Sequence, residues 1–429
     1  MKRNKFLEST IILLIGGFVT KCLGFVIRII YTRMVGSEAI SLYTIVTPTY
    51  SLLLTIATLS LPIAISKLIA EEKNSSKKIL VSSSVITLFL NIAVIITILL
   101  TSDFIAINLL KEPRAKYLLI AMSLTFPFVS LSSIIKGYFY GKQKMMPHTV
   151  SNVIEQIVRL VLIMLVIPNL LQKGIVYAVI GLILLSIASE TASIITFLCF
   201  LPKKFNIKAN EIKPDLGTIK NILNISLPTV SSRLIGNIGF FFEPIILTNL
   251  LLLTGYSSDY ILTEYGAYNA YSISLLTLPS FFIMAISSAL IPEISKFYVN
   301  HDYKMVKKRY NQAIRISFFI GLLFSILIMI CRNNLLEILY GTTTGSNYIL
   351  VLAPLFVLFY LEGPLVSTLQ AIGKANETMK ITFIGVIIKL FVMSILSLCH
   401  IGMYSLVIAE IINIIYVVFV NFKKIHKYI

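Results

Sequence analysis

Hydrophobic positions in this chain gather into long runs, which short polar stretches separate. Each run is close to or above the roughly 20 apolar residues that a helix needs to cross a bilayer. Neither the period-2 alternation of strands nor a narrow apolar stripe dominates, so the pattern predicts membrane helices that are apolar on most sides. The twelve predicted segments are 9–32, 40–69, 79–101, 115–138, 148–168, 174–200, 219–250, 261–291, 312–332, 347–370, 380–399 and 402–422.

Lysine and arginine are distributed unevenly between the two sides that these segments define. With a cytoplasmic N-terminus, the inside stretches hold 23 of them and the outside stretches hold 6. Cytoplasmic loops carry the excess of positive charge in membrane proteins. The asymmetry therefore predicts a multi-pass membrane protein with cytoplasmic N- and C-termini and an even number of helices.

The longest inside connection divides the chain into two halves of six segments. It runs from Pro202 to Pro214 and is rich in lysine. We therefore predict an all-α protein with an N-terminal six-helix lobe over 1–201, a cytoplasmic linker over 202–218 and a C-terminal six-helix lobe over 219–429. Both halves keep the same orientation, which is the arrangement of a parallel repeat about an axis along the membrane normal.

Composition agrees with a membrane protein and excludes some partners. The chain is 57% hydrophobic and 13% charged, whereas soluble domains carry about 25% charged residues. The net charge of +18 resides mainly in short loops, where positive-inside topology and anionic lipid headgroups account for it. No basic and aromatic platform lies outside the apolar runs, so nucleic acid is not an expected partner.

The motifs of common enzymes are absent from the sequence. Only four histidines occur, none in a His-Glu-x-x-His pair, and no Walker loop or Gly-x-Ser-x-Gly elbow is present. All four aspartates lie outside the apolar runs, and the four cysteines are scattered singly. We therefore expect no catalytic residue, no metal site, no cofactor and no enzymatic activity.

Charged residues inside the apolar runs are the strongest functional signal. Burying a charge at the bilayer centre costs about 2.5–3.5 kcal/mol on insertion scales, so such residues face a bundle interior or a wet cavity. Lys21 and Arg28 are seven residues apart, which places them on one helix face. Arginine and lysine together favour phosphate. The predicted substrate-binding cations are Lys21, Arg28, Arg159, Arg233 and Lys389.

Glutamates in the same runs leave several roles open. Glu155 and Arg159 are four residues apart in the order that favours an ion pair within one helix. This pair either fixes helix packing or belongs to the substrate site. The acidic residues expected to balance charge, or to carry a coupling proton or ion, are Glu155, Glu190, Glu243 and Glu410.

Three stretches resemble a known family. They are Gly24-Phe-Val-Ile-Arg28, Leu61-Pro-Ile-Ala-Ile-Ser-Lys-Leu-Ile-Ala-Glu71, and Lys136-Gly-Tyr-Phe-Tyr-Gly-Lys142 followed by Ser151-Asn-Val-Ile-Glu-Gln-Ile-Val-Arg159. The chain resembles the stage V sporulation protein B branch of the polysaccharide transporters. That branch belongs to the multidrug/oligosaccharidyl-lipid/polysaccharide (MOP) exporter superfamily, beside the lipid II flippases.

The resemblance implies two six-helix lobes around a cavity with alternating access. Its implied substrate is an undecaprenyl-pyrophosphate-linked saccharide, such as a peptidoglycan precursor for the spore cortex. Basic residues of the first helix line the cavity of lipid II flippases; Lys21 matches one of them, and Arg28 is displaced by one residue. Many relatives have fourteen helices, whereas this sequence predicts twelve, which puts a groove for the lipid tail in doubt.

Two other functions stay open at this stage. A multidrug or cation antiporter of the same fold would need an acidic or aromatic cavity, whereas the cavity predicted here is basic. A membrane scaffold without transport would recruit cell-wall synthesis enzymes. The expected partners of the leading hypothesis are the anionic lipid-linked saccharide and membrane lipids, with cell-wall synthesis enzymes as further partners of a monomeric chain.

Overall fold

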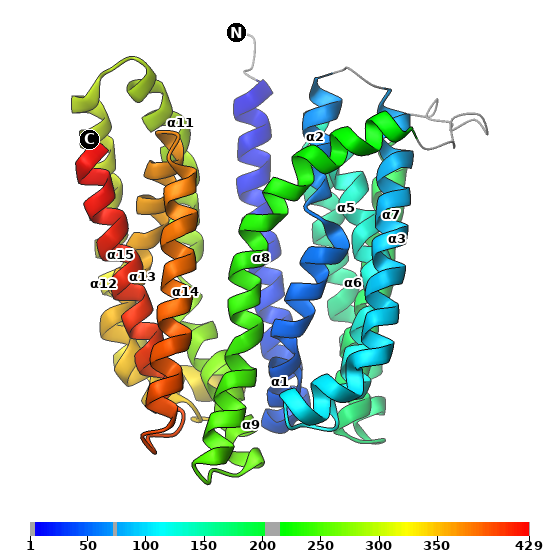
Figure 1. Cartoon of the computed structure of the whole chain (residues 1–429), viewed down its shortest axis with the longest axis vertical. Coiled ribbons are helices and arrows are strands. Elements are labelled where there is room, and N and C mark those ends of the chain that lie inside the picture. Colours follow the sequence, from blue (N-terminus) through cyan, green and yellow to red (C-terminus); the bar gives the residue numbers. More distant parts are fainter. Residues whose placement is uncertain (1–4, 72–74, 202–214, 429) are drawn as a thin grey trace. The chain divides into compact units, whose positions relative to one another are not determined.

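The computed structural model describes residues 5–71, 75–201 and 215–428 (Figure 1). These residues form helices joined by short turns, and they divide into two compact units, 1–241 and 242–429. The unit boundary lies inside a helix, while 202–214 of the predicted linker fall outside the described residues. The lobe boundaries expected from the sequence stay a prediction.

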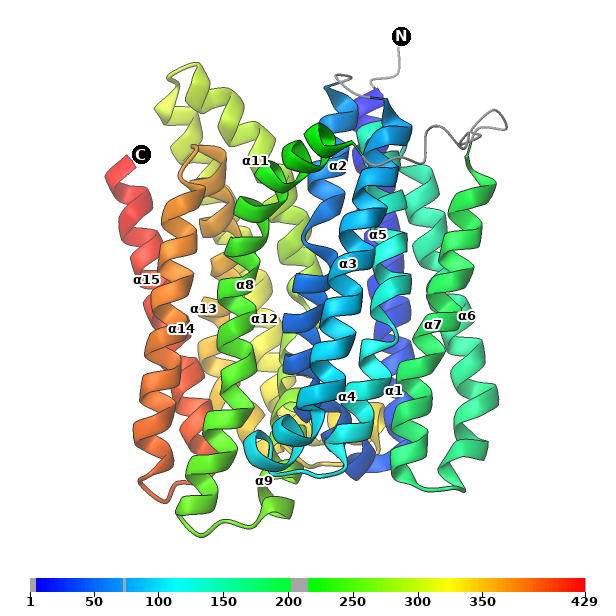
Figure 2. The ribbon, with the colours of Figure 1, turned by 45° about the vertical axis from the view of Figure 1, so that its right-hand side comes forward.

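The first unit contains seven α-helices, one π-helix and the start of an eighth α-helix. Figures 1 and 2 show its long helices running roughly parallel to one another. The elements are α1 (Lys5–Thr58), α2 (Leu61–Ala70), α3 (Ser76–Asp103), η1 (Phe104–Leu109), α4 (Ala115–Ser123), α5 (Phe126–Gly141), α6 (Met146–Leu171), α7 (Ile175–Cys199) and the first part of α8 (Leu216–Leu253).

Helix α1 contains two of the predicted segments. Gly36 adopts φ 81° and ψ 178°, a non-helical conformation between them. A positive φ of this kind is accessible to glycine and costly for residues that carry a Cβ. The break separates the first predicted segment, 9–32, from the second, 40–69, and the two halves of α1 run in opposite directions (Figure 1).

Close packing in the first unit explains why the start of α8 belongs to it. Ile222 of α8 is fully buried in one apolar cluster with Ile65, Ile134 and Phe197, residues of α2, α5 and α7. Further along α8, Asn237 donates a hydrogen bond of 2.6 Å to Thr55 Oγ1 of α1. The first turns of α8 are therefore part of the N-terminal core.

The second unit contains the remainder of α8 and eight further helical elements among the described residues. Within it α12 packs against α13, and α14 packs against α15. The elements are α9 (Ser258–Gly266), η3 (Ala267–Ile273), α10 (Ser274–Thr277), α11 (Ser280–Val299), α12 (Tyr303–Tyr340), α13 (Ser346–Ala371), α14 (Ala375–Ser397) and α15 (Tyr404–Tyr428).

The eighth predicted segment is not one continuous helix. The range 261–291 is divided among α9, the π-helical η3, α10 and α11. The last break occurs at Leu278 and Pro279, directly before α11. Proline has no N–H to continue the ladder of hydrogen bonds, and its ring clashes with the preceding turn. The residues of this segment remain helical, but its axis is interrupted.

The distribution of side chains is that of a membrane protein. Large apolar residues point outward, for example Leu100 at 78% and Phe89 at 74% exposure, whereas Ser82, Ser193 and Asn421 are fully buried. In lipid, apolar groups gain nothing by facing inward, and small polar residues bring helices close together. The described residues contain eleven helices long and apolar enough to span, the first of which holds both halves of α1.

Candidate functional site

The first helix brings two predicted cations onto a face that turns toward α6. Lys21, Gly24 and Arg28 are spaced by three and four residues, so they lie on one side of α1. A Cβ at Gly24 would lie 3.8 Å from Gln156 Oε1 of α6, which places this face of α1 against that helix. Lys21 is exposed and Arg28 is half-buried. The face therefore presents cationic groups along the α1–α6 contact.

Arg159 is bound within the N-terminal unit by two groups. Its Nη2 lies 2.9 Å from Glu155 Oε1 on the same helix, and its Nε donates a hydrogen bond of 3.2 Å to Ser189 Oγ on α7. Gln156 Nε2 donates a longer bond of 3.5 Å to the same glutamate oxygen. The ion pair that the four-residue spacing predicts is present, and a serine from the neighbouring helix holds the guanidinium in place.

Two further charges surround this pair. Glu190 of α7 is 7% exposed, and its Oε2 has no hydrogen-bond partner among the described residues. Lys136 of α5 and Glu190 both interact electrostatically with Glu155. Glu155, Arg159, Glu190 and Lys136 together carry two positive and two negative formal charges. We call these four residues the Arg159 cluster; its formal charge is zero.

Arg233, the fourth predicted cation, does not belong to that group. It is exposed on α8, and no ion pair to it is found in the described part of the chain. A Cβ added at Gly236, one turn further on, would meet open space. Small and polar residues flank Arg233 in the sequence, and its side chain is accessible.

Lys389, the fifth predicted cation, is enclosed by carboxylates in the C-terminal unit. Its Nζ lies 2.6 Å from Glu243 Oε2 of α8 and also forms an ion pair with Glu410 of α15. The side chain of Lys389 is 16% exposed, that of Glu243 is 4% exposed and that of Glu410 is 17% exposed. One ammonium from α14 thus joins three helices, and both glutamates are its counterions.

A tyrosine completes this arrangement. Tyr265 of α9 is 1% exposed, and its hydroxyl donates a hydrogen bond of 3.1 Å to Glu243 Oε1. Both oxygens of this buried glutamate therefore have partners, which a charged group in a low-dielectric interior requires. We call Glu243, Lys389, Glu410 and Tyr265 the Lys389 cluster. Its three charged groups carry a formal charge of −1.

Sequence reasoning missed one member of each cluster, Lys136 and Tyr265, and two neighbouring hydrogen-bond partners, Ser189 and Gln156. Lys136 lies near the end of a predicted segment, where lysines usually reach the interface, and Ser189 and Tyr265 are unremarkable in an apolar run. Gln156 had a local signal, because it follows Glu155 directly. Glu243 and Glu410 were expected to balance charge, but no local signal paired them with Lys389, because they lie on other helices.

Comparison with known proteins now decides the family. The family described as "Polysaccharide biosynthesis protein" matches residues 6–298. The chain is also 36% identical to stage V sporulation protein B of Bacillus subtilis over 400 residues, which cover 91% of this chain and 77% of that protein. The chain belongs to the polysaccharide biosynthesis protein family.

Further comparisons show similarity to a flippase and to a multidrug transporter. The chain is 25% identical to the lipid II flippase MurJ of Bacillus subtilis, over 90% of this chain and 76% of that protein. A second family, MatE, matches residues 244–395. A multidrug resistance MATE family transporter of the MOP superfamily, solved in an inward-facing conformation, superposes with a TM-score of 0.78 at 17% identity. That superposition covers 94% of this chain and 93% of the transporter.

These likenesses establish the class of protein. The chain is a multi-pass membrane protein, and its all-α fold of spanning helices in two lobes is that of the MATE transporter. Of the similar proteins above, MurJ is a lipid II flippase and the MATE protein is a multidrug transporter.

Proposed function

We propose that this protein is a flippase that carries an undecaprenyl-pyrophosphate-linked saccharide across the bacterial cytoplasmic membrane by alternating access. Two relatives support the substrate class: stage V sporulation protein B and the lipid II flippase MurJ. A peptidoglycan precursor, used in the spore cortex, is the proposed cargo. No catalysis is needed, because the cargo crosses unchanged.

The cationic face of α1 is the observation that carries the proposal. Lys21 and Arg28 lie on one side of a membrane helix, with Gly24 between them against Gln156. A diphosphate carries several acceptor oxygens, which ammonium and guanidinium donors bind with charge-assisted hydrogen bonds. We assign the headgroup to Lys21 and Arg28, with the exposed Arg233 as a further cation.

The two remaining predicted cations receive secondary roles in this proposal. Arg159 and Lys389 each hold at least one carboxylate at ion-pair distance, which a diphosphate would have to displace. We therefore assign Arg159 and Lys389, with Glu155, Glu190, Glu243 and Glu410, to charge balance within the helices. The glutamates also remain our candidates for coupling to a proton or ion. The active species in this proposal is a monomer with both termini in the cytoplasm.

A cation or multidrug antiporter is the second candidate function. The MatE family match over 244–395 favours it, and the Lys389 cluster shows that two glutamates of this unit can surround a cation. An antiporter would transport cationic dyes, and that transport would depend on Glu243 and Glu410.

The decisive experiment measures translocation of a labelled undecaprenyl-diphosphate saccharide in proteoliposomes that contain the full chain. The native chain is compared with Lys21→Gln/Arg28→Gln and with a control, Lys304→Gln/Lys308→Gln, which removes two exposed charges. Hydrogen bonds to charged groups contribute about 1.5–3 kcal/mol each, so we expect the first variant to lose at least about tenfold in rate. The control should retain the native rate.

Each outcome has a definite meaning. Equal rates in the three proteins would overturn the assignment of the headgroup to α1 and leave the flippase function standing. No translocation by the native chain, under an imposed potential or an ion gradient, would reject the flippase. Transport of a cationic dye would then support the antiporter, and the absence of both would support a scaffold.

A further inference from the structure

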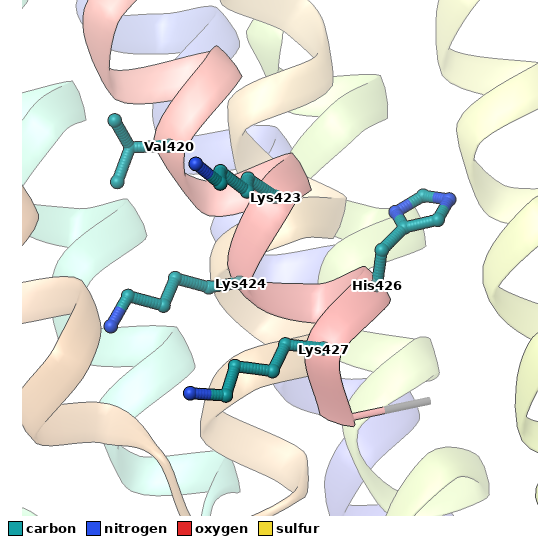
Figure 3. A pocket seen from close by; sticks show the side chains of 5 residues that line it. All are labelled: Val420, Lys423, Lys424, His426 and Lys427. Atoms are coloured by element: carbon teal, nitrogen blue, oxygen red, sulfur yellow. The ribbon is translucent and has the colours of Figure 1, made fainter.

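The last turns of α15 carry a cluster of basic side chains around a pocket of about 520 Å³ (Figure 3). Figure 3 shows the side chains of Lys423, Lys424 and Lys427 leaving the helix on the side of Val420, while His426 leaves on the other side. Residues 420, 423, 424 and 427 are spaced so that they share one helix face. Three ammonium groups therefore gather at one end of the C-terminal unit.

Most of this positive charge is not neutralised by the protein. Lys424 Nζ lies 2.8 Å from Glu377 Oε2 of α14. Lys423 and Lys427 are exposed, and neither has an ion pair among the described residues. The cationic face thus has an excess of two positive charges over its single acidic neighbour.

A fourth ammonium lies at the same end of the helix bundle. Lys374, which precedes α14, places its Nζ 4.9 Å from the centre of the Tyr428 ring, the last described residue of α15. A cation over an aromatic ring is held by the ring quadrupole and keeps its charge. The contact also holds the end of α15 next to α14, which keeps the basic residues together.

An exposed apolar stripe runs along α15 on the face next to the lysines. Ile415 is 44% exposed, Phe419 is 66% exposed and Phe422 is 45% exposed, and their spacing of four and three residues places them on one face. Phe419 precedes Lys423 by four residues, so the stripe lies beside that lysine. The ring of His426 lies 4.2 Å from that of Phe422, on the other side of the helix. One helix therefore offers an apolar stripe with concentrated positive charge beside its last turns.

We propose that this end of α15 is a binding site for the headgroup of an anionic phospholipid, whose acyl chains lie along Ile415, Phe419 and Phe422. Basic clusters at the ends of membrane helices attract anionic headgroups. A soluble phosphate would satisfy the lysines but has no group for the apolar stripe. This site is independent of the α1 face and of the cargo proposed for it.

The test measures lipid binding to the purified full chain in detergent by native mass spectrometry. Phosphatidylglycerol and phosphatidylcholine of equal chain length are titrated against the native chain, Lys423→Gln/Lys427→Gln and the control Lys304→Gln/Lys308→Gln. The control also removes two exposed lysines four residues apart, on α12. We expect the Lys423/Lys427 variant to lose about 10- to 30-fold in affinity for phosphatidylglycerol. The control should lose less than about threefold.

A further variant and a further ligand test whether the site binds a phospholipid rather than a soluble phosphate. Phe419→Ser should weaken phosphatidylglycerol binding while leaving the lysines in place, and glycerol phosphate, which has no acyl chains, should fail to compete. Equal loss in both lysine variants, or equal affinity of the native chain for the two lipids, would overturn the site. Full competition by glycerol phosphate would replace the lipid with a soluble phosphate and overturn the proposal. Circular dichroism confirms that each variant is folded.

Discussion

The Arg159 cluster and the Lys389 cluster solve the same physical problem in different ways. Both hold a cation among membrane helices, where an unpaired charge is expensive. In the N-terminal unit, Arg159 takes its carboxylate from one turn earlier on its own helix and a hydroxyl from α7. In the C-terminal unit, Lys389 takes both carboxylates from other helices, α8 and α15.

This difference separates local stabilisation from tertiary stabilisation. The Glu155–Arg159 ion pair forms whenever α6 is helical, because both residues lie on that helix. Its contribution to stability therefore does not depend on how α6 packs against other helices. The Lys389 pairs exist only when α8, α14 and α15 are correctly packed. We therefore expect substitutions in the Lys389 cluster to affect the stability of the unit, and substitutions in the Arg159 cluster to have smaller effects.

The largest expected effect is that of Lys389→Met. Removal of the ammonium leaves Glu243 and Glu410 buried without their counterion, and breaking a buried pair in this way costs about 3–5 kcal/mol. Thermal unfolding in detergent, followed by circular dichroism because the chain has no tryptophan, should show a large decrease in Tm. Adding Glu243→Gln and Glu410→Gln should recover most of the loss. An unchanged Tm for Lys389→Met would contradict the tertiary role of this residue.

Arg159→Met should destabilise the protein less. The arginine side chain is 26% exposed, compared with 16% for Lys389, and its loss leaves Glu155 close to Lys136. We expect a cost of about 1–3 kcal/mol, the usual penalty for leaving a hydrogen-bonded group unpaired. The same Tm measurement checks it, with Glu155→Gln/Arg159→Met as the matched neutral pair. A decrease as large as that of Lys389→Met would remove the contrast between the two clusters.

Tyr265→Phe isolates one hydrogen bond of the Lys389 cluster. The hydroxyl that donates to Glu243 Oε1 at 3.1 Å is lost, while the ring and its packing remain. Because Glu243 keeps its ion pair with Lys389, we expect a cost of about 1–2 kcal/mol. In the Lys389→Met background the same substitution should cost more, since Tyr265 is then the remaining donor to that carboxylate. A double-mutant cycle of Tm values tests this coupling.

The smallest expected effect belongs to Ser189→Ala. The substitution removes a neutral hydroxyl that accepts from Arg159 Nε at 3.2 Å, and the guanidinium keeps its carboxylate. Because the acceptor is neutral and the guanidinium is partly exposed, we expect a cost of about 0.5–1.5 kcal/mol, the net value of a typical intramolecular hydrogen bond. A measurable Tm decrease is expected for Ser189→Ala, whereas Ser186→Ala, one turn earlier on α7, serves as the control. If the two variants melt alike, Ser189 does not position Arg159.

The contrast between interactions within one helix and interactions between helices also explains which features could be predicted from the sequence. Hydrophobic run length depends on bilayer thickness, so the segments were predictable, including two that meet at Gly36. The break before Pro279 was harder to predict, because a proline in a membrane helix can be tolerated when neighbouring groups satisfy the freed carbonyl. Glu155 and Arg159 followed from the helical period. The partners of Lys389 depend on which helices pack together, and no local spacing encodes that choice.

The ion pairs that join α8, α14 and α15 at Lys389 also have a consequence for biosynthesis. Glu243 precedes Lys389 by 146 residues in the chain, so at about 5–20 residues per second the ribosome makes the glutamate about 7–30 s before its ammonium partner. Tyr265, 22 residues after Glu243, is the first member of the cluster to follow it. Until Lys389 emerges, α8 must reside beside the translocon or a membrane chaperone with an uncompensated carboxyl group. The C-terminal unit therefore closes late, when α14 delivers the charge that lets α8 settle fully into lipid.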